Sequence, residues 1–192
     1  MPGTQQKSVI HSMRLVSTTR RPTAGTDKRH DRRGQSLVEF ALILTPLMLI
    51  LLGILQFGFI FNSYVTMTNA VREGGRTATI HIYDRSLSKN QNDLARNEAV
   101  RLALTSSMNM LQTSSPNFAN GGSWSSSGDV FTNGDLVVQY DSLPVSDPRT
   151  GQRVTVRATH HQDLIIPLIA GLLPRDANGR LGIVTEVTMV IN

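Results

Sequence analysis

The chain has 192 residues, a formal net charge of +5 and no cysteine. This length allows one modest domain plus an anchor, and the lack of cysteine excludes disulfides, thiolate zinc sites and cysteine nucleophiles. The positive charge lies in residues 1–33, which hold eight Lys or Arg against two Asp, for a net +6. The rest of the chain holds 11 basic and 12 acidic residues, for a net −1. The basic pI therefore describes a tail and not a basic globular surface.

Residues 1–34 are predicted to be a basic cytoplasmic leader without regular structure, since they are rich in Arg, Thr, Ser and Gly and lack apolar periodicity. A basic tail can bind nucleic acid. This one adjoins a long apolar run, which favours a topology signal that keeps the N-terminus in the cytoplasm. We therefore expect membrane lipid and not nucleic acid as the partner of this region.

Residues 40–61 contain no charged residue over 22 positions. A helix of this length rises about 33 Å, enough to cross the hydrocarbon core of a bilayer. A buried helix of a soluble protein rarely runs so far without a polar face, and a signal peptide has a shorter apolar region with a small-x-small cleavage site. The run thus predicts one transmembrane helix, in which Pro46 is tolerable. We expect residues 35–82 to form this transmembrane and juxtamembrane helix.

The start of this helix is predicted at Ser36, because Ser36 and Glu39 have the spacing of a capping box. A carboxylate at the edge of the hydrocarbon is costly unless it has a partner, which makes Glu39 a candidate functional residue. Within the apolar run, the small residues Gly53 and Gly58 permit close approach of another helix.

Residues 83–192 are predicted to form an exported domain with a second helix and a small antiparallel sheet, so the fold class is α+β. Apolar spacing predicts the helix over Asp93–Leu111. Asn120–Gly128 has the composition of a loop. Strands are expected at Asp135–Tyr140, Arg153–Thr159 and Ile183–Ile191. The apolar segment Leu164–Pro174 is too short to span a membrane, and is interpreted as a partly helical crossover that packs on the sheet or on the bilayer surface.

Few residues suggest chemistry. His160 and His161, with Asp163 nearby, invite a metal site, but adjacent strand residues point to opposite faces. Asp176–Gly179 lacks the spaced ligands of a calcium loop and is interpreted as a turn. No nucleophile elbow or phosphate-binding loop occurs. We expect no catalytic residue, metal or cofactor, and a protein that is not an enzyme.

Three stretches carry a resemblance to a known family: Gly34–Ala41 followed by Pro46, then Gly53–Gly58, then Asn69–Arg76. Together they resemble the TadE-like family, pseudopilin-like proteins of the tight-adherence (Flp) pilus apparatus. The stretch from Gly34 also resembles the processing site of type IV pilin-like precursors. This resemblance implies a pilin-like fold and cleavage by a prepilin peptidase between Gly34 and Gln35, with Glu39 as the fifth residue of the mature chain.

The Asn69–Arg76 stretch has two interpretations that the sequence leaves open. On a helix Arg72 and Arg76 share one face, and Glu73 can reach Arg76 at i+3. The segment is either a solvated juxtamembrane helix that contacts anionic headgroups, or a contact between subunits.

The leading hypothesis is a minor pseudopilin or assembly component of a Tad-type pilus or related secretion machine, in the inner membrane. Its implied partners are the prepilin peptidase, other pilin-like subunits and inner-membrane pilus assembly proteins. The alternative is an uncleaved single-pass envelope protein whose exported domain binds a ligand or partner. An exported enzyme is the least supported reading.

Overall fold

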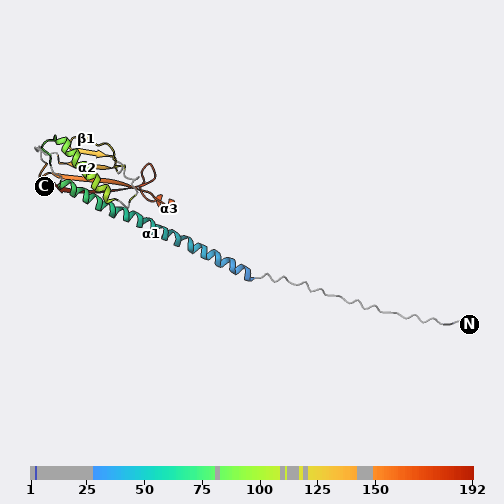
Figure 1. The fold of residues 1–192 in the computed structure, drawn as a ribbon. Coiled ribbons are helices and arrows are strands. Elements are labelled where there is room, and N and C mark those ends of the chain that lie inside the picture. The colour runs from blue at the N-terminus through green and yellow to red at the C-terminus, as the bar shows by residue number, and fades with distance from the viewer. Residues whose placement is uncertain are drawn as a thin grey trace. The chain divides into compact units, whose positions relative to one another are not determined.

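The computed structural model describes residues 28–80, 83–108, 121–141 and 149–192, together with residues 3, 111, 117 and 118. Most of the predicted leader, residues 4–27, lies outside this set. The chain divides into two units, Met1–Leu44 and Thr45–Asn192. The second unit is an α+β fold, as expected (Figure 1). It contains one sheet and the whole of two of the three helices described below.

Helix α1 covers Lys28–Ile80, 53 residues with Pro46 inside it. The predicted start at Ser36 is wrong, because the helix begins eight residues earlier, at a run rich in Lys and Arg, which are good helix formers. Ser36 is therefore an interior residue and caps nothing. The prediction that the apolar run continues without a break into a juxtamembrane helix is confirmed.

Helix α2 covers Lys89–Ser107 and begins at a capping box. The amide of Gln91 donates to Ser88 Oγ at 3.3 Å, and the Ser88 amide donates to Gln91 Oε1 at 2.9 Å. The predicted helix over Asp93–Leu111 exists but starts and ends four residues too late, because the cap at Ser88 sets its start.

Five antiparallel strands form one sheet in the order β1-β2-β3-β4-β5, so each strand pairs with its neighbours in sequence. Their bounds are β1 Ser125–Ser127, β2 Val130–Asn133, β3 Leu136–Tyr140, β4 Arg153–Gln162 and β5 Leu181–Val190. The three predicted strands are confirmed as β3, β4 and β5. The loop predicted over Asn120–Gly128 is wrong at Ser125–Ser127, where β1 pairs with β2. The turn after Asn133 joins β2 to β3, with Gly134 at φ 57°.

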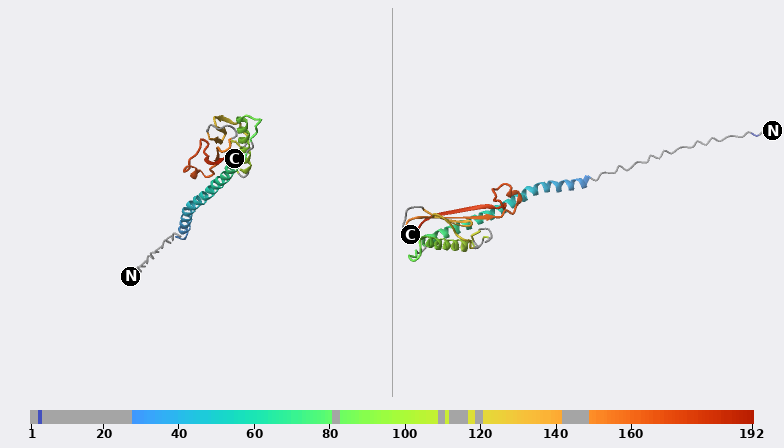
Figure 2. Two further views of the ribbon diagram at one scale, coloured as in Figure 1. Left: turned by 90° about the vertical axis from the view of Figure 1, so that its left-hand side faces the viewer. Right: turned by 90° about the horizontal axis from the view of Figure 1, so that it is seen from above.

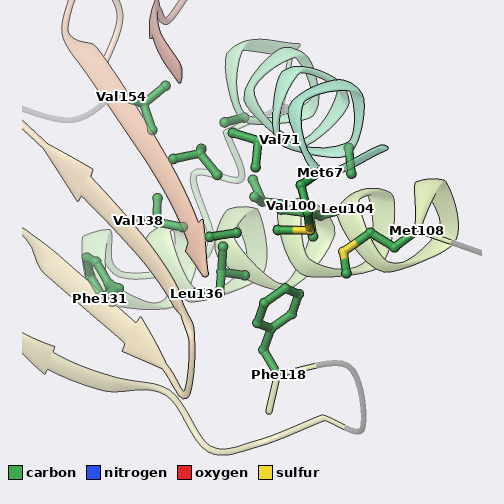
Figure 3. Close-up of a cluster of buried hydrophobic side chains, with 14 of the residues drawn as sticks. Met67, Val71, Val100, Leu104, Met108, Phe118, Phe131, Leu136, Val138 and Val154 are labelled. Atoms are coloured by element: carbon green, nitrogen blue, oxygen red, sulfur yellow. The ribbon is translucent and has the colours of Figure 1, made fainter. Parts of the chain in front are cut away.

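The core lies between one face of the sheet and two helices, α2 and the C-terminal part of α1. Figure 3 shows the side chains of both helices pointing toward those of the strands. The residues labelled there are all buried: Met67 and Val71 from α1, Val100, Leu104 and Met108 from α2 and its end, and Phe118, Phe131, Leu136, Val138 and Val154. Alternate residues of β4, such as Arg153 and Arg157, are exposed on the other face of the sheet.

A pair of adjacent glycines lets α1 approach both of its neighbours. A Cβ placed on Gly74 would lie 3.4 Å from Cγ1 of Val100 in α2. A Cβ placed on Gly75 would lie only 2.7 Å from Cγ1 of Val187 in β5. Each glycine lowers helix propensity, but the pair permits close packing on both sides of α1.

The crossover from β4 to β5 contains the short helix α3, Pro167–Ala170. Its partly helical character is therefore as expected. Figure 2 shows this segment beside α1, at the end of the sheet farthest from the C-terminus.

Candidate membrane anchor and contact surface

The first half of α1 presents large apolar side chains to its surroundings. Among the described residues, one helix is long and apolar enough to cross a membrane, and it lies within Gly34–Ile80. Its most apolar window is not buried in the protein. Exposed side chains include Phe40 at 61%, Ile50 at 63%, Ile54 at 64% and Phe61 at 68%. Transferring such a surface from water to lipid is strongly favourable, so α1 is a single-pass anchor by length and composition.

The residues predicted for processing lie within α1 and are exposed. Apart from the two neighbouring residues and the local helix backbone, no described atom lies within 4 Å of a Cβ built on Gly34. The side chain of Gln35 donates from Nε2 to Glu39 Oε1 at 2.9 Å, one turn further along. The side-chain amide of Gln35 is thus a hydrogen-bond partner of Glu39 in this chain.

The two small residues predicted for helix packing have different surroundings. A Cβ on Gly53 would lie 3.6 Å from Cδ1 of Ile169 in α3, so this face of α1 is covered by the same chain. A Cβ on Gly58 would meet nothing within 4 Å. Gly58 remains open to a second helix, whereas the neighbour of Gly53 is α3.

Two polar residues of α1 hold the strand β4 and the segment after it, and sequence analysis missed both. Gln56 is 1% exposed; its Oε1 accepts from the Ile165 amide at 2.9 Å and its Nε2 donates to the Asp163 carbonyl at 3.5 Å. Ser63 Oγ donates to Gln162 Oε1 at 2.5 Å. The available signal was a lone Gln within an apolar run, since polar groups in such positions usually have a partner.

The four residues predicted as a contact surface, Asn69, Arg72, Glu73 and Arg76, are all exposed on α1. No ion pair within 4.0 Å joins Glu73 to Arg76 in the part of the chain that the structure describes, so the expected i+3 pair is not formed. Arg72 lines an open groove of about 320 Å³ between α1 and β5, together with Tyr64, Thr68, Val71 and residues 184–187.

A buried group of charged residues around Arg149 stabilises the domain. Arg149 is paired with Asp93 through two hydrogen bonds of 2.8 Å, and its Nη2 donates to Asp129 Oδ1 at 2.6 Å. Its guanidinium carbon lies 4.2 Å from the centre of the Tyr140 ring. The hydrogen bond from Arg149 lowers the pKa of Asp129, and burial raises the pKa of Tyr140. These contacts are internal, and a structural role accounts for them.

The two adjacent histidines of β4 have different surroundings. His160 is buried, and burial lowers its pKa. His161 lies at the next strand position, with Nδ1 2.9 Å from Asp176 Oδ2 and Nε2 3.3 Å from Asp135 Oδ1. No cluster of three His, Cys, Asp or Glu that fits a metal ion occurs among the described residues. The turn predicted at Asp176–Gly179 is confirmed, with Asp176 Oδ1 accepting from two backbone amides.

These features define a class: an α+β protein with a single N-terminal membrane anchor whose helix continues into the core of the domain. A family model narrows the class, since residues 34–76 match TadE, described as TadE-like protein. The resemblance stated from the sequence is thereby confirmed for that segment, which lies entirely within α1. The match suggests a component associated with a Tad pilus. Neither the curated proteins nor the solved structures contain a match to this chain.

Proposed function

We propose that this protein is a minor pseudopilin or assembly component of a Tad-type pilus or related secretion machine, and that it is non-enzymatic. It acts by insertion into the inner membrane, cleavage after Gly34 and lateral packing of α1. The N-terminus lies in the cytoplasm, because basic residues precede the apolar run. The domain lies on the opposite side of the membrane.

One observation supports this proposal above the others. The TadE-like match begins at Gly34, and the uncharged run of α1 begins six residues later, at Phe40. A family match that starts at the proposed scissile residue supports a mature N-terminus at Gln35. Gly34 is also exposed, which favours access by a membrane peptidase.

Cleavage would give Glu39 a second partner. The new α-amine on Gln35 lies one helical turn before Glu39, within the spacing at which helix residues interact. In the uncleaved chain, the side-chain amide of Gln35 already donates a hydrogen bond to the Glu39 carboxylate. The mature carboxylate can then pair with its own N-terminus or with that of a neighbouring subunit, which is how a helix of this kind would pack in an assembly. Gly58, Asn69, Arg72, Glu73 and Arg76 are the exposed positions that we propose for contacts with other pilin-like subunits and assembly proteins.

Co-expression with a prepilin peptidase tests the processing step. Intact mass and N-terminal sequencing of the membrane fraction should give a chain that begins at Gln35. Gly34→Ala should leave the precursor uncut, and Gly58→Ala, a glycine change in the same helix, should be cut normally. An unchanged mass for the wild-type chain, or normal cutting of Gly34→Ala, contradicts the processing claim.

The second candidate is an uncleaved single-pass envelope protein whose domain binds a ligand or partner. One observation favours it: α1 begins at Lys28 and runs through the Gly34–Gln35 bond. A peptide bond inside a helix must be unwound before a protease can cut it. Residues 1–34 retained in membranes that contain an active prepilin peptidase would support this candidate.

A further inference from the structure

The crossover between β4 and β5 presents apolar side chains that the domain does not cover. Residues 164–174 contain no charged residue, and Asp163 and Arg175 border them. The side chain of Ile165 is 68% exposed and that of Leu172 is 83% exposed. A soluble loop rarely keeps two large apolar side chains so exposed within eight residues, which makes this segment a candidate contact surface.

The crossover is attached to α1 inside the apolar run. Ile169 of α3 packs on Gly53, and the Ile165 amide donates to Gln56. Gly53 precedes Phe61, the end of the apolar run, by eight residues, or about 12 Å of helix. A hydrocarbon core of about 30 Å requires nearly all of residues 40–61. The level of Gly53 is therefore within the membrane and not above it.

Irregular backbone at membrane depth must have its polar groups satisfied by the protein. The crossover meets this condition at four of its nine backbone amides. The Ile165 amide bonds to Gln56, and the amides of Ala170, Gly171 and Leu172 bond to carbonyls within the segment at 2.9, 3.2 and 2.9 Å. Pro167 and Pro174 have no amide proton to satisfy. These bonds remove part of the desolvation cost that keeps ordinary loops out of lipid.

We propose that residues 164–174 are a second membrane contact, inserted into the hydrocarbon of the leaflet nearest the domain, with Ile165 and Leu172 in contact with lipid. The apolar side chains of the crossover continue the lipid-facing surface of α1, and Asp163 and Arg175 lie toward the headgroups. The insertion fixes the depth and rotation of α1 and holds the domain against the bilayer. This inference requires the α1 anchor but not the processing or the pilus role.

Single-cysteine labelling of the full chain tests the proposal, because the sequence has no cysteine of its own. An environment-sensitive fluorophore is attached at Ile165→Cys or Leu172→Cys, and the protein is reconstituted in phosphatidylcholine vesicles. Quenching is measured with a lipid that carries a quencher on its acyl chain, and separately with iodide in the water. Ile54→Cys, 64% exposed on α1, is the membrane control, and Val184→Cys, 56% exposed on β5, is the aqueous control.

The proposal predicts that the labels at Ile165 and Leu172 behave like the label at Ile54. The lipid quencher should act on them several-fold more strongly than on the label at Val184, and iodide several-fold more weakly. If Ile54 is quenched from the lipid while Ile165 and Leu172 match Val184, the crossover lies in water and the proposal is overturned while the anchor stands. If the Ile54 label also responds only to iodide, the anchor and the proposal both fail.

Discussion

The backbone of α1 at Gly75 lies so close to β5 that a Cβ there would be 2.7 Å from Cγ1 of Val187. Real Cβ atoms do not approach other atoms this closely, and the branched Val187 side chain cannot rotate freely out of the way. Gly75 therefore sets the distance between the anchor helix and the sheet, and the helix cannot move away without opening the core on this side.

Gly75→Ala is expected to destabilise the domain by about 1–3 kcal/mol, the usual cost of overpacking a core. Gly74→Ala is the matched control, because its Cβ would lie 3.4 Å from Val100, an ordinary contact. It should be neutral or stabilising by up to about 1 kcal/mol through helix propensity. Thermal unfolding in detergent measures both. Equal melting temperatures for the two variants would contradict the close approach.

Asp93→Ala should cost about 3–5 kcal/mol, because it leaves the buried Arg149 guanidinium, 3% exposed, without the partner that binds it twice. The exposed pair of Arg153 and Asp141 provides the comparison, since Arg153 is 66% exposed. Asp141→Ala should cost less than about 1 kcal/mol. Denaturant unfolding of the two variants compares them directly, and a loss of similar size in both would show that the buried pair contributes nothing special.

Stability should fall as the pH drops below about 6.5, the ordinary pKa of histidine. Burial lowers the pKa of His160 in the folded state, so the unfolded chain binds the proton more readily. The stabilising effect of neutral His160 is fully present above the unfolded pKa and is lost as the pH decreases. Melting temperatures measured from pH 7.5 to 5 should decline for the wild type and decline less for His160→Asn. Melting temperatures that decline equally with pH in the two proteins would rule out a contribution from His160.

Gln56→Leu should loosen the crossover, because it removes the acceptor of the Ile165 amide and a donor to the Asp163 carbonyl. Loss of one such hydrogen bond should raise amide exchange over residues 163–166 by up to about tenfold. Ser63→Ala is the control, since it removes the bond to Gln162 and leaves the Ile165 amide bonded. Hydrogen exchange read by mass spectrometry distinguishes them; unchanged exchange in Gln56→Leu would contradict the attachment.

The features of the fold that the sequence predicted correctly are those that depend on patterns over many residues. The uncharged run of residues 40–61 was sufficient to predict the anchor, and alternation was sufficient for β3, β4 and β5. The stretches between Gly34 and Arg76 predicted the resemblance to the TadE-like family. The family-model match over residues 34–76 supports it. Each of these signals extends over several residues, so no single tertiary contact can reverse it.

The predictions that were wrong, and the contacts that were missed, depended on local signals or on residues far away in the sequence. The capping box at Ser36 matches a real pattern, but the helix-forming residues before it extend α1 to Lys28. β1 consists of three serines in a Gly/Ser stretch, and only its pairing with β2 makes it a strand. The role of Gln56 depends on residues more than 100 positions away, which no local pattern reveals. The proposed cleavage and the contact roles of Gly58 and Asn69–Arg76 stay predictions.

We infer that α1 crosses the bilayer while its C-terminal part builds the core of the domain. Extraction of isolated membranes at alkaline pH, followed by immunoblotting of pellet and supernatant, tests it most directly. The wild-type chain should stay in the pellet, whereas Leu49→Lys/Leu52→Lys, with two charges in the apolar run, should be released in large part. Release of the wild-type chain into the supernatant would contradict the account.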